Sequence, residues 1–221
     1  LEDKLVLLED VRKNLSFTDK MSGLFLSKKR DRALLKRFKL DKIKEDDPAA
    51  ILFTSGTETY PKGVPLSHKN LLSNQRAALS DVSFSKDDIL YGVLPPFHSF
   101  GFSVTGLFPI LSGMRAFYSP DPTDAHRIAQ DLFEREITII FCAPSFFRNI
   151  FSVASEEQLK SVRLFVTGAE RCPVSLFKYV EKLGGEKEMF EGYGITECSP
   201  ILTINQRKSL NDGVGFPLSN V

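Results

Sequence analysis

The chain has 221 residues, of which 42% are hydrophobic, so it can bury a substantial core. Its formal net charge is only +1, which argues against a general nucleic-acid-binding protein. Cys142, Cys172 and Cys198 are scattered without metal-ligand spacing, and this favours a reduced, cytoplasmic setting. No apolar run approaches the length of a membrane span.

Residues 1–47 differ in composition from the rest and are predicted to form a basic helical segment. A helix is predicted over residues 15–38, and basic residues greatly outnumber acidic ones over residues 28–44. The apolar residues that recur among these charges at helical spacing are Leu34, Leu35 and Phe38. This pattern indicates a basic amphipathic helix. Two interpretations stay open: a solvated helix face, or a docking surface for an acidic partner or an anionic membrane.

From residue 48 onward, apolar runs alternate with helical patterns, which predicts an α/β fold with a largely parallel sheet covered by helices. The first run, Ala49–Phe53, is interpreted as a buried strand. Further strands are predicted over residues 89–94, 114–118, 137–142, 161–167 and 188–191. Helices are predicted from an N-cap at Ser67 to about residue 82, over 101–111 and 123–135, from Pro144, and over 174–183. Ligands of such sheets bind beyond the carboxyl ends of the strands, so the strand exits are the candidate site.

The segment after the first predicted strand suits a phosphate group. It reads Thr54-Ser55-Gly56-Thr57-Glu58-Thr59-Tyr60-Pro61-Lys62-Gly63. Glycines let backbone N–H groups approach an anion, hydroxyls donate hydrogen bonds, and the lysine supplies positive charge. It is not the common phosphate loop, in which Ser or Thr follows the lysine and binds magnesium. An ordinary polar turn is the alternative interpretation.

A histidine follows the next predicted strand, in the segment Pro95-Pro96-Phe97-His98-Ser99-Phe100-Gly101. A histidine flanked by prolines and phenylalanines is expected to be held stiffly in an apolar setting. It could then donate a hydrogen bond to a carboxylate or gate a tunnel. A purely structural role for His98 is the alternative.

Two more segments lie at later strand exits. Thr167-Gly168-Ala169-Glu170 is a turn of small residues against which a planar base can lie. Tyr193-Gly194-Ile195-Thr196-Glu197 combines an aromatic ring, which suits a purine, with a carboxylate. A carboxylate and a phosphate oxygen together form a normal Mg²⁺ shell.

In this order, the segments resemble the motifs of the adenylate-forming superfamily, which contains acyl-CoA synthetases, acyl-carrier-protein synthetases, luciferases and peptide-synthetase adenylation domains. The resemblance implies ATP and Mg²⁺ as cofactors. It implies that the triphosphate is bound by Thr54, Ser55, Gly56, Thr57, Lys62 and Gly63. It also implies that Glu58, Thr59 and Thr167 are departures from the family pattern; Glu58 brings a carboxylate near a polyanion.

The same resemblance gives roles to the other motif residues. His98 helps orient the carboxylic acid, while Gly168, Ala169 and Glu170 pack under the adenine. Tyr193 stacks on the adenine next to Gly194. Thr196 bonds the α-phosphate, and Glu197 helps hold Mg²⁺. Lys62, His98 and Thr196 are therefore the expected catalytic residues.

Residues 48–221 are thus expected to be part of the AMP-binding domain of a fatty-acid ligase. Thr-Glu-x-x-Pro-Lys in the loop and Leu-Glu-Asp-Val-Arg near the start resemble one subgroup. This is the synthetase half of bifunctional 2-acylglycerophosphoethanolamine acyltransferase/acyl-acyl-carrier-protein synthetases. The resemblance implies a long-chain fatty acid as substrate, acyl carrier protein as partner, and a parent protein that acylates lysophospholipids at the inner face of the membrane.

Two alternatives remain at this point. One is a long-chain acyl-CoA synthetase with CoA as the acceptor; the other is a non-catalytic nucleotide- or partner-binding module. The family's ribose-binding Asp and its C-terminal domain with a catalytic lysine have no counterpart in this chain. The chain is therefore expected to be an internal piece of such an enzyme, inactive by itself.

Overall fold

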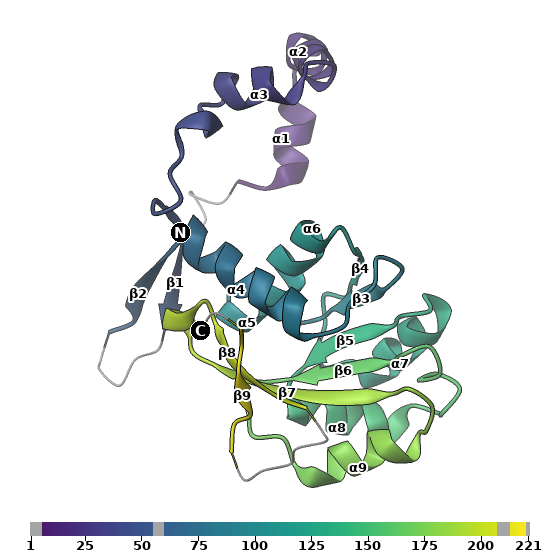
Figure 1. Ribbon diagram of the computed structural model, residues 1–221. Coiled ribbons are helices and arrows are strands. Elements are labelled where there is room, and N and C mark those ends of the chain that lie inside the picture. Colours follow the sequence, from purple (N-terminus) through teal and green to yellow (C-terminus); the bar gives the residue numbers. More distant parts are fainter. Residues whose placement is uncertain (1–5, 55–59, 207–212, 220–221) are drawn as a thin grey trace. The chain divides into compact units, whose positions relative to one another are not determined.

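The computed structural model describes residues 6–54, 60–206 and 213–219 of the chain, which divides into two compact units between Lys44 and Glu45 (Figure 1). The backbone explains the place of the division. The carbonyl groups of Glu45 and Asp47 accept hydrogen bonds from Lys69 N and His68 N, so residues 45–47 are tied to the second unit.

The first unit consists of short helices, and none of their described residues is buried. They are α1 (Leu8–Asn14), α2 (Phe17–Ser27), α3 (Asp31–Arg37) and the 3₁₀ turn η2 (Leu40–Lys42). The prediction of one helix over residues 15–38 is wrong, because Arg30 leaves the helical conformation with φ −65° and ψ 146°. Lys39, with φ 57°, then separates α3 from η2. The basic residues of this region therefore do not share one continuous amphipathic helix.

The second unit is built on a mixed sheet with the strand order β4–β3–β5–β6–β7–β8–β9. Its strands are β3 (Ile89–Gly92), β4 (Arg115–Tyr118), β5 (Ile139–Cys142), β6 (Leu164–Thr167), β7 (Glu188–Gly194), β8 (Ile201–Gln206) and β9 (Phe216–Pro217). Strands β3 to β7 run parallel, whereas β8 and β9 are antiparallel. The predicted α/β class and the mainly parallel sheet are confirmed; β8, β9 and the extension of β7 to Gly194 were not predicted.

Helices cover both faces of this sheet (Figure 1). One face packs against α7 (Ala125–Glu134), α8 (Pro144–Val153) and α9 (Val174–Lys182). The other packs against α4 (His68–Asp81) and a helical segment made of α5 (Ser99–Gly101), the π-helix η3 (Phe102–Leu107) and α6 (Phe108–Ser112). In β5, Ile140 and Cys142 face the first group while Ile139 and Phe141 face the second. Burial on both faces explains why these strands are apolar without alternation.

The predicted helix from Ser67 is confirmed as α4. Ser67 Oγ accepts a hydrogen bond from Asn70 N at 3.1 Å, and Asn70 Oδ1 accepts from Ser67 N at 3.3 Å. This reciprocal pair is a capping box, and it fixes the first turn of the helix.

Strands β1 (Pro48–Thr54) and β2 (Lys62–Ser67) form a separate antiparallel hairpin. Ala49–Phe53 does form a strand, but the prediction that this strand is buried is wrong. Ile51 is 59% exposed and Phe53 71% exposed. The apolar run predicted a strand correctly, but over the described residues its only strand partner is β2, and a two-stranded hairpin buries little surface.

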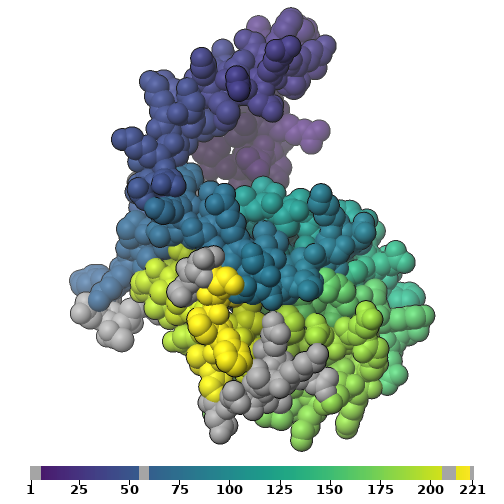
Figure 2. Space-filling view, viewed as in Figure 1, coloured from purple at the N-terminus to yellow at the C-terminus, as the bar shows by residue number. Residues whose placement is uncertain are grey.

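Residues 213–219 lie on the surface of the second unit and are coloured yellow in Figure 2. Ser219 N donates to Asp81 Oδ2 at 2.7 Å, and Leu218 N donates to Leu202 O at 2.9 Å. Within the described part of the chain, no helix has both the length and the apolar character needed to cross a membrane.

Candidate functional site at the strand exits

The segment with His98 forms a tight turn after β3. His98 N donates to Pro95 O at 3.2 Å, and Phe102 N donates to His98 O at 2.7 Å. A Cβ on Gly101 would lie 2.0 Å from Pro95 O, so this close turn requires glycine. The His98 side chain is exposed, with its ring 4.9 Å from that of Phe97. The backbone is held firmly as expected, but the imidazole faces solvent instead of an apolar setting.

The small-residue turn lies at the exit of β6. Gly168 is buried, and a Cβ there would meet Gly192 O at 3.1 Å and the Phe100 ring at 3.3 Å. Ala169 takes the left-handed conformation with φ 68°. The exposed Glu170 accepts a hydrogen bond from Ser145 Oγ at 3.0 Å. The turn thus brings the backbone close to β7 and to the histidine turn.

The last motif spans the end of β7 and the 3₁₀ turn η4 (Thr196–Cys198). Tyr193 is 46% exposed, and Glu197 is also exposed. Thr196 Oγ1 lies 3.0 Å from Ser99 Oγ, which joins this motif directly to the histidine turn. A Cβ on Gly194 would lie 1.9 Å from Pro200 O, so the return into β8 also requires glycine.

The phosphate-type segment belongs to the β1–β2 hairpin and not to an exit of the parallel sheet. Thr54 ends β1 and pairs with Lys62, and Gly63 pairs with Phe53. A Cβ on Gly63 would approach Ile51 and Phe53 at 3.3–3.4 Å. Strand β2 contacts η4, which carries Thr196 and Glu197. The predicted ligands Ser55, Gly56 and Thr57 lie outside the described residues.

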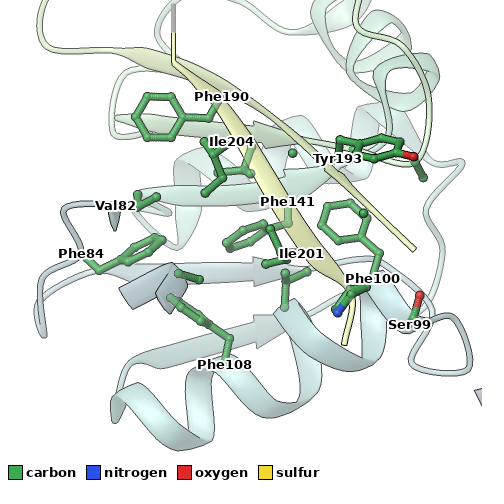
Figure 3. A pocket seen from close by; sticks show the side chains of 18 residues that line it. Val82, Phe84, Ser99, Phe100, Phe108, Phe141, Phe190, Tyr193, Ile201 and Ile204 are labelled. Atoms are coloured by element: carbon green, nitrogen blue, oxygen red, sulfur yellow. The ribbon is translucent and has the colours of Figure 1, made fainter. Parts of the chain in front are cut away.

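Two cavities meet at these strand exits. An apolar cavity of about 120 Å³ lies between the sheet and α4, η3 and α6 (Figure 3). A larger cavity of about 800 Å³, which we call the polar cavity because its lining is more polar than that of the first, is lined by residues that include Glu170, Glu191 and Asn205 beside apolar ones. The residues that line both cavities are Ala169, Gly192, Tyr193 and Gly194. The two cavities therefore adjoin along the exits of β6 and β7.

Three residues of this region carry structural roles that motif reasoning missed. The buried Asn74 on α4 donates to Ile201 O at 2.6 Å and accepts from Ile201 N at 3.2 Å, which braces the start of β8. Glu191 Oε1 accepts from Cys172 N at 2.6 Å and so holds the wall of the polar cavity. Ser99 lies in the motif that contains His98, where the sequence indicated no role for it, and its hydroxyl accepts the hydrogen bond from Thr196. A polar residue on the buried face of a helix, as at Asn74, is a usable sequence signal.

The cysteines near the site are free. Burial raises the pKa of Cys172 to about 12, and the nearby Glu191 carboxylate acts in the same direction. Burial likewise raises the pKa of Cys142 to about 12. Both thiols therefore stay protonated near neutral pH, which excludes them as nucleophiles.

Comparison with known proteins places this arrangement in a family. The model described as "AMP-binding enzyme" matches residues 4–221. The chain belongs to this family. The expected relationship to the adenylate-forming superfamily is thereby confirmed.

Individual relatives support the same assignment. A long-chain-fatty-acid–CoA ligase from Bacillus subtilis is 30% identical over 168 residues, which are 73% of this chain and 29% of the ligase. Gramicidin S synthase 2 from Brevibacillus brevis is 31% identical over 182 residues, which are 79% of this chain and 4% of the synthase. The crystal structure of ATP-bound MatB from Rhodopseudomonas palustris superposes with a TM-score of 0.69 at 30% identity, covering 80% of this chain and 35% of MatB. The chain thus spans less than a third of the length of the fatty-acid ligase and of the gramicidin synthase.

Proposed function

We propose that this chain forms the acid- and nucleotide-binding part of an ATP-dependent ligase that activates a long-chain fatty acid as its acyl-adenylate. The observation that carries the proposal is the contact between the two cavities. An apolar cavity suits an alkyl chain, a polar cavity of about 800 Å³ suits a nucleotide, and both open on Ala169 and Tyr193. A carboxylate at the end of the alkyl chain would then meet the α-phosphate at their shared wall.

The nucleotide is assigned to the polar cavity. Tyr193 presents an exposed ring for stacking on adenine, and the turn Gly168–Glu170, whose Gly168 lies close to Gly192 of β7, offers backbone beneath it. Thr196 Oγ1 donates to Ser99 Oγ at 3.0 Å, and it would turn this proton to the α-phosphate when the nucleotide binds. Thr54, Lys62 and Gly63 at the loop end of the hairpin, with Ser55, Gly56 and Thr57 between Thr54 and Lys62 in the sequence, would bind the outer phosphates.

The acid is assigned to the apolar cavity. Among its described lining residues, the side-chain polar atoms are the hydroxyls of Ser99 and Tyr193. An amino acid would need a carboxylate to pair with its ammonium group, and these lining residues supply none. A fatty acid therefore fits better than the amino acids that a peptide synthetase activates. The exposed His98 next to Ser99 is assigned to the acid's carboxylate.

Magnesium fits the site as a shared ligand and not as a preformed cage. Within the described part of the chain, no group of three or more His, Cys, Asp or Glu side chains could hold a metal ion. The exposed Glu197 would supply one carboxylate, and phosphate oxygens and water would complete the shell. When bound, Mg²⁺ neutralises phosphate charge during transfer.

In the proposed reaction, the fatty-acid carboxylate attacks the α-phosphorus of ATP and pyrophosphate leaves. Lys62 neutralises the departing phosphates, while Thr196 holds the α-phosphate in line. A thiol then takes the acyl group and AMP is released. We propose acyl carrier protein as the thiol donor, on the basis of the sequence motifs alone. CoA is the second candidate, because CoA ligases are among the relatives.

The decisive experiment is ATP–pyrophosphate exchange by the whole protein that carries this chain, with Mg²⁺ and palmitate. Lys62→Ala is expected to lower the exchange rate by about 100-fold or more, the usual cost of removing a transition-state donor. Lys69→Ala is the matched control, because Lys69 is an exposed residue on α4 that pairs with Glu45 at 3.8 Å. Equal exchange by all three proteins would remove Lys62 from the site, and no fatty-acid-dependent exchange would refute the proposal. AMP release with acyl carrier protein or CoA then identifies the acceptor.

A further inference from the structure

The apolar cavity has two ends of different character. Ser99, Phe100 and Tyr193 lie at one end, which we call the mouth (Figure 3). Val82, Phe84 and Phe108 lie at the other, which we call the far end (Figure 3). The mouth borders the polar cavity and has exposed residues, such as Tyr193 at 46%. At the far end, Val82 is 6% exposed and Phe108 is 2% exposed.

A series of phenylalanine rings follows the cavity between these ends. The Phe84 and Phe108 ring centroids are 4.7 Å apart, those of Phe108 and Phe141 are 5.9 Å apart, and those of Phe141 and Phe100 are 6.5 Å apart. All three contacts are edge-to-face, at 65°, 65° and 81°. Such packing fixes ring positions, so the wall is stiff and does not adapt freely to ligands.

Phe84 differs from Phe108 and Phe141 because it is only partly buried, as is Phe100 at the mouth. It follows α4 and lies against Phe108, so its ring is the partly exposed part of the aromatic wall at the far end. An alkyl chain that enters at the mouth with its carboxylate near Thr196 would meet Phe84 and Phe108 with its methyl end. A longer chain would have to displace a ring from an edge-to-face contact or leave methylenes in water.

We infer that Phe84, braced by Phe108, closes the far end of the acyl cavity and sets the longest fatty acid that this site accepts. The inference rests on the proposed function, because it needs the alkyl chain to enter from the nucleotide side. Removing the Phe84 ring opens the far end to solvent and lets longer chains extend through it. Filling the cavity from its wall has the opposite effect.

The test compares chain-length profiles of the whole protein and its variants in ATP–pyrophosphate exchange with octanoate, laurate, myristate, palmitate and stearate. Phe84→Ala is expected to raise the kcat/KM ratio of the longest acid to laurate by about tenfold, the usual discrimination for misfitting methylenes. Ala78→Leu adds bulk from α4, one turn before Val82, and is expected to shift the ratio toward the shorter acids. Phe133→Ala removes a 50% exposed ring on α7 that does not line the cavity, and it should keep the wild-type profile.

A second readout separates this inference from the proposed function. Displacement of the fluorescent fatty acid cis-parinaric acid by the same acids measures the cavity without any chemistry. If wild-type protein lacks exchange but Phe84→Ala shifts the displacement series toward longer acids, the ligase proposal fails and the cavity inference stands. Identical profiles for wild type, Phe84→Ala and Ala78→Leu, with far-ultraviolet circular dichroism that shows folded variants, would overturn it. If one of the two cavity variants does not fold, the profile of the other decides.

Discussion

We expect Asp88→Asn to lower the free energy of unfolding by about 3 kcal/mol near neutral pH. Asp88 precedes β3, and its side chain is 4% exposed. Arg163 Nε and Thr138 Oγ1 donate to its Oδ1 at 2.9 and 2.8 Å. Arg163 Nη2 and Ser85 N donate to its Oδ2 at 2.5 and 2.7 Å. One carboxylate thus ties together the segments that lead into β3, β5 and β6.

The magnitude follows from these four contacts. Asparagine keeps one acceptor oxygen, but an NH₂ group replaces the other. This NH₂ group would face the two donors that now bond the second carboxylate oxygen. Hydrogen bonds to charged groups contribute about 1.5–3 kcal/mol each, so the gross loss from two such bonds is roughly 3–6 kcal/mol. The Arg163 side chain is 35% exposed and can be hydrated in the variant, and the buried carboxylate no longer has to be desolvated. These two effects reduce the loss to about 3 kcal/mol.

The pH dependence gives a second, independent check. Burial alone would raise the pKa of Asp88, but hydrogen bonds from Arg163, Ser85 and Thr138 outweigh it and hold the pKa below its ordinary value. A lowered folded-state pKa means that the stabilisation is fully present above the unfolded-state pKa of about 3.9. It is lost as pH falls through the lower folded-state pKa. The stability difference between wild type and Asp88→Asn should therefore be constant near neutral pH and shrink below about pH 4.

The assay is urea unfolding followed by circular dichroism at a series of pH values. Asp87→Asn is the control, because Asp87 is exposed and adjacent, and its effect should stay within about 0.5 kcal/mol. Equal urea midpoints for wild type and Asp88→Asn at neutral pH would refute the reasoning. So would a large difference that persists undiminished in acid, because it could not come from an ionised carboxylate.

Two other predictions concern the site itself. Gly101→Ala should lower the melting temperature by several degrees, because its Cβ would lie 2.0 Å from Pro95 O. Gly106→Ala in η3 should be neutral or stabilising, since a Cβ there meets nothing within 4 Å. Similar melting temperatures for both variants would contradict the geometry of the histidine turn. Iodoacetamide should modify Cys198 in the folded protein while sparing Cys142 and Cys172, which peptide mass spectrometry can measure. The reason is that burial raises the pKa of Cys142 and of Cys172 to about 12, which lowers their thiolate fraction about 1,000-fold. Rapid alkylation of Cys142 before unfolding would show that β5 is not buried as described.

Much of the second unit follows from local sequence patterns. The strand β5 and the first three residues of β6 are apolar because helices cover both faces of the sheet, and such runs are easily recognised as buried strands. The helix α4 is marked by its cap at Ser67, and α8 by Pro144 at its first turn. The sequence predicts all four motif segments at strand exits, and in the structure three of them lie there while the phosphate-type segment belongs to the β1–β2 hairpin.

Other features depend on contacts that local patterns do not encode. The segment Ala49–Phe53 has the composition of a core strand, but pairing with β2 places it in an exposed hairpin. Gly192 and Gly194 resemble a turn, yet β7 continues through them because β8 pairs with it on the far side. The helix expected over residues 15–38 breaks at Arg30, where the first unit offers no buried face to hold it together. In each case tertiary packing, or its absence, overrides propensity.

The hydroxyl pair of Thr196 and Ser99 shows what the fold adds beyond the motifs. These residues are 97 positions apart, yet their oxygens lie 3.0 Å apart, and Ser99 lines the apolar cavity. Thr196 donates its hydroxyl proton to Ser99 in this bond, and a hydroxyl that accepts one hydrogen bond can donate another, so Ser99 keeps its own proton for a ligand. The glycines at positions 101 and 194 allow the two tight turns that bring these hydroxyls together. One hydrogen bond thus joins the histidine turn to the Thr196 motif, and the close backbone approaches that only these two glycines allow make that bond possible.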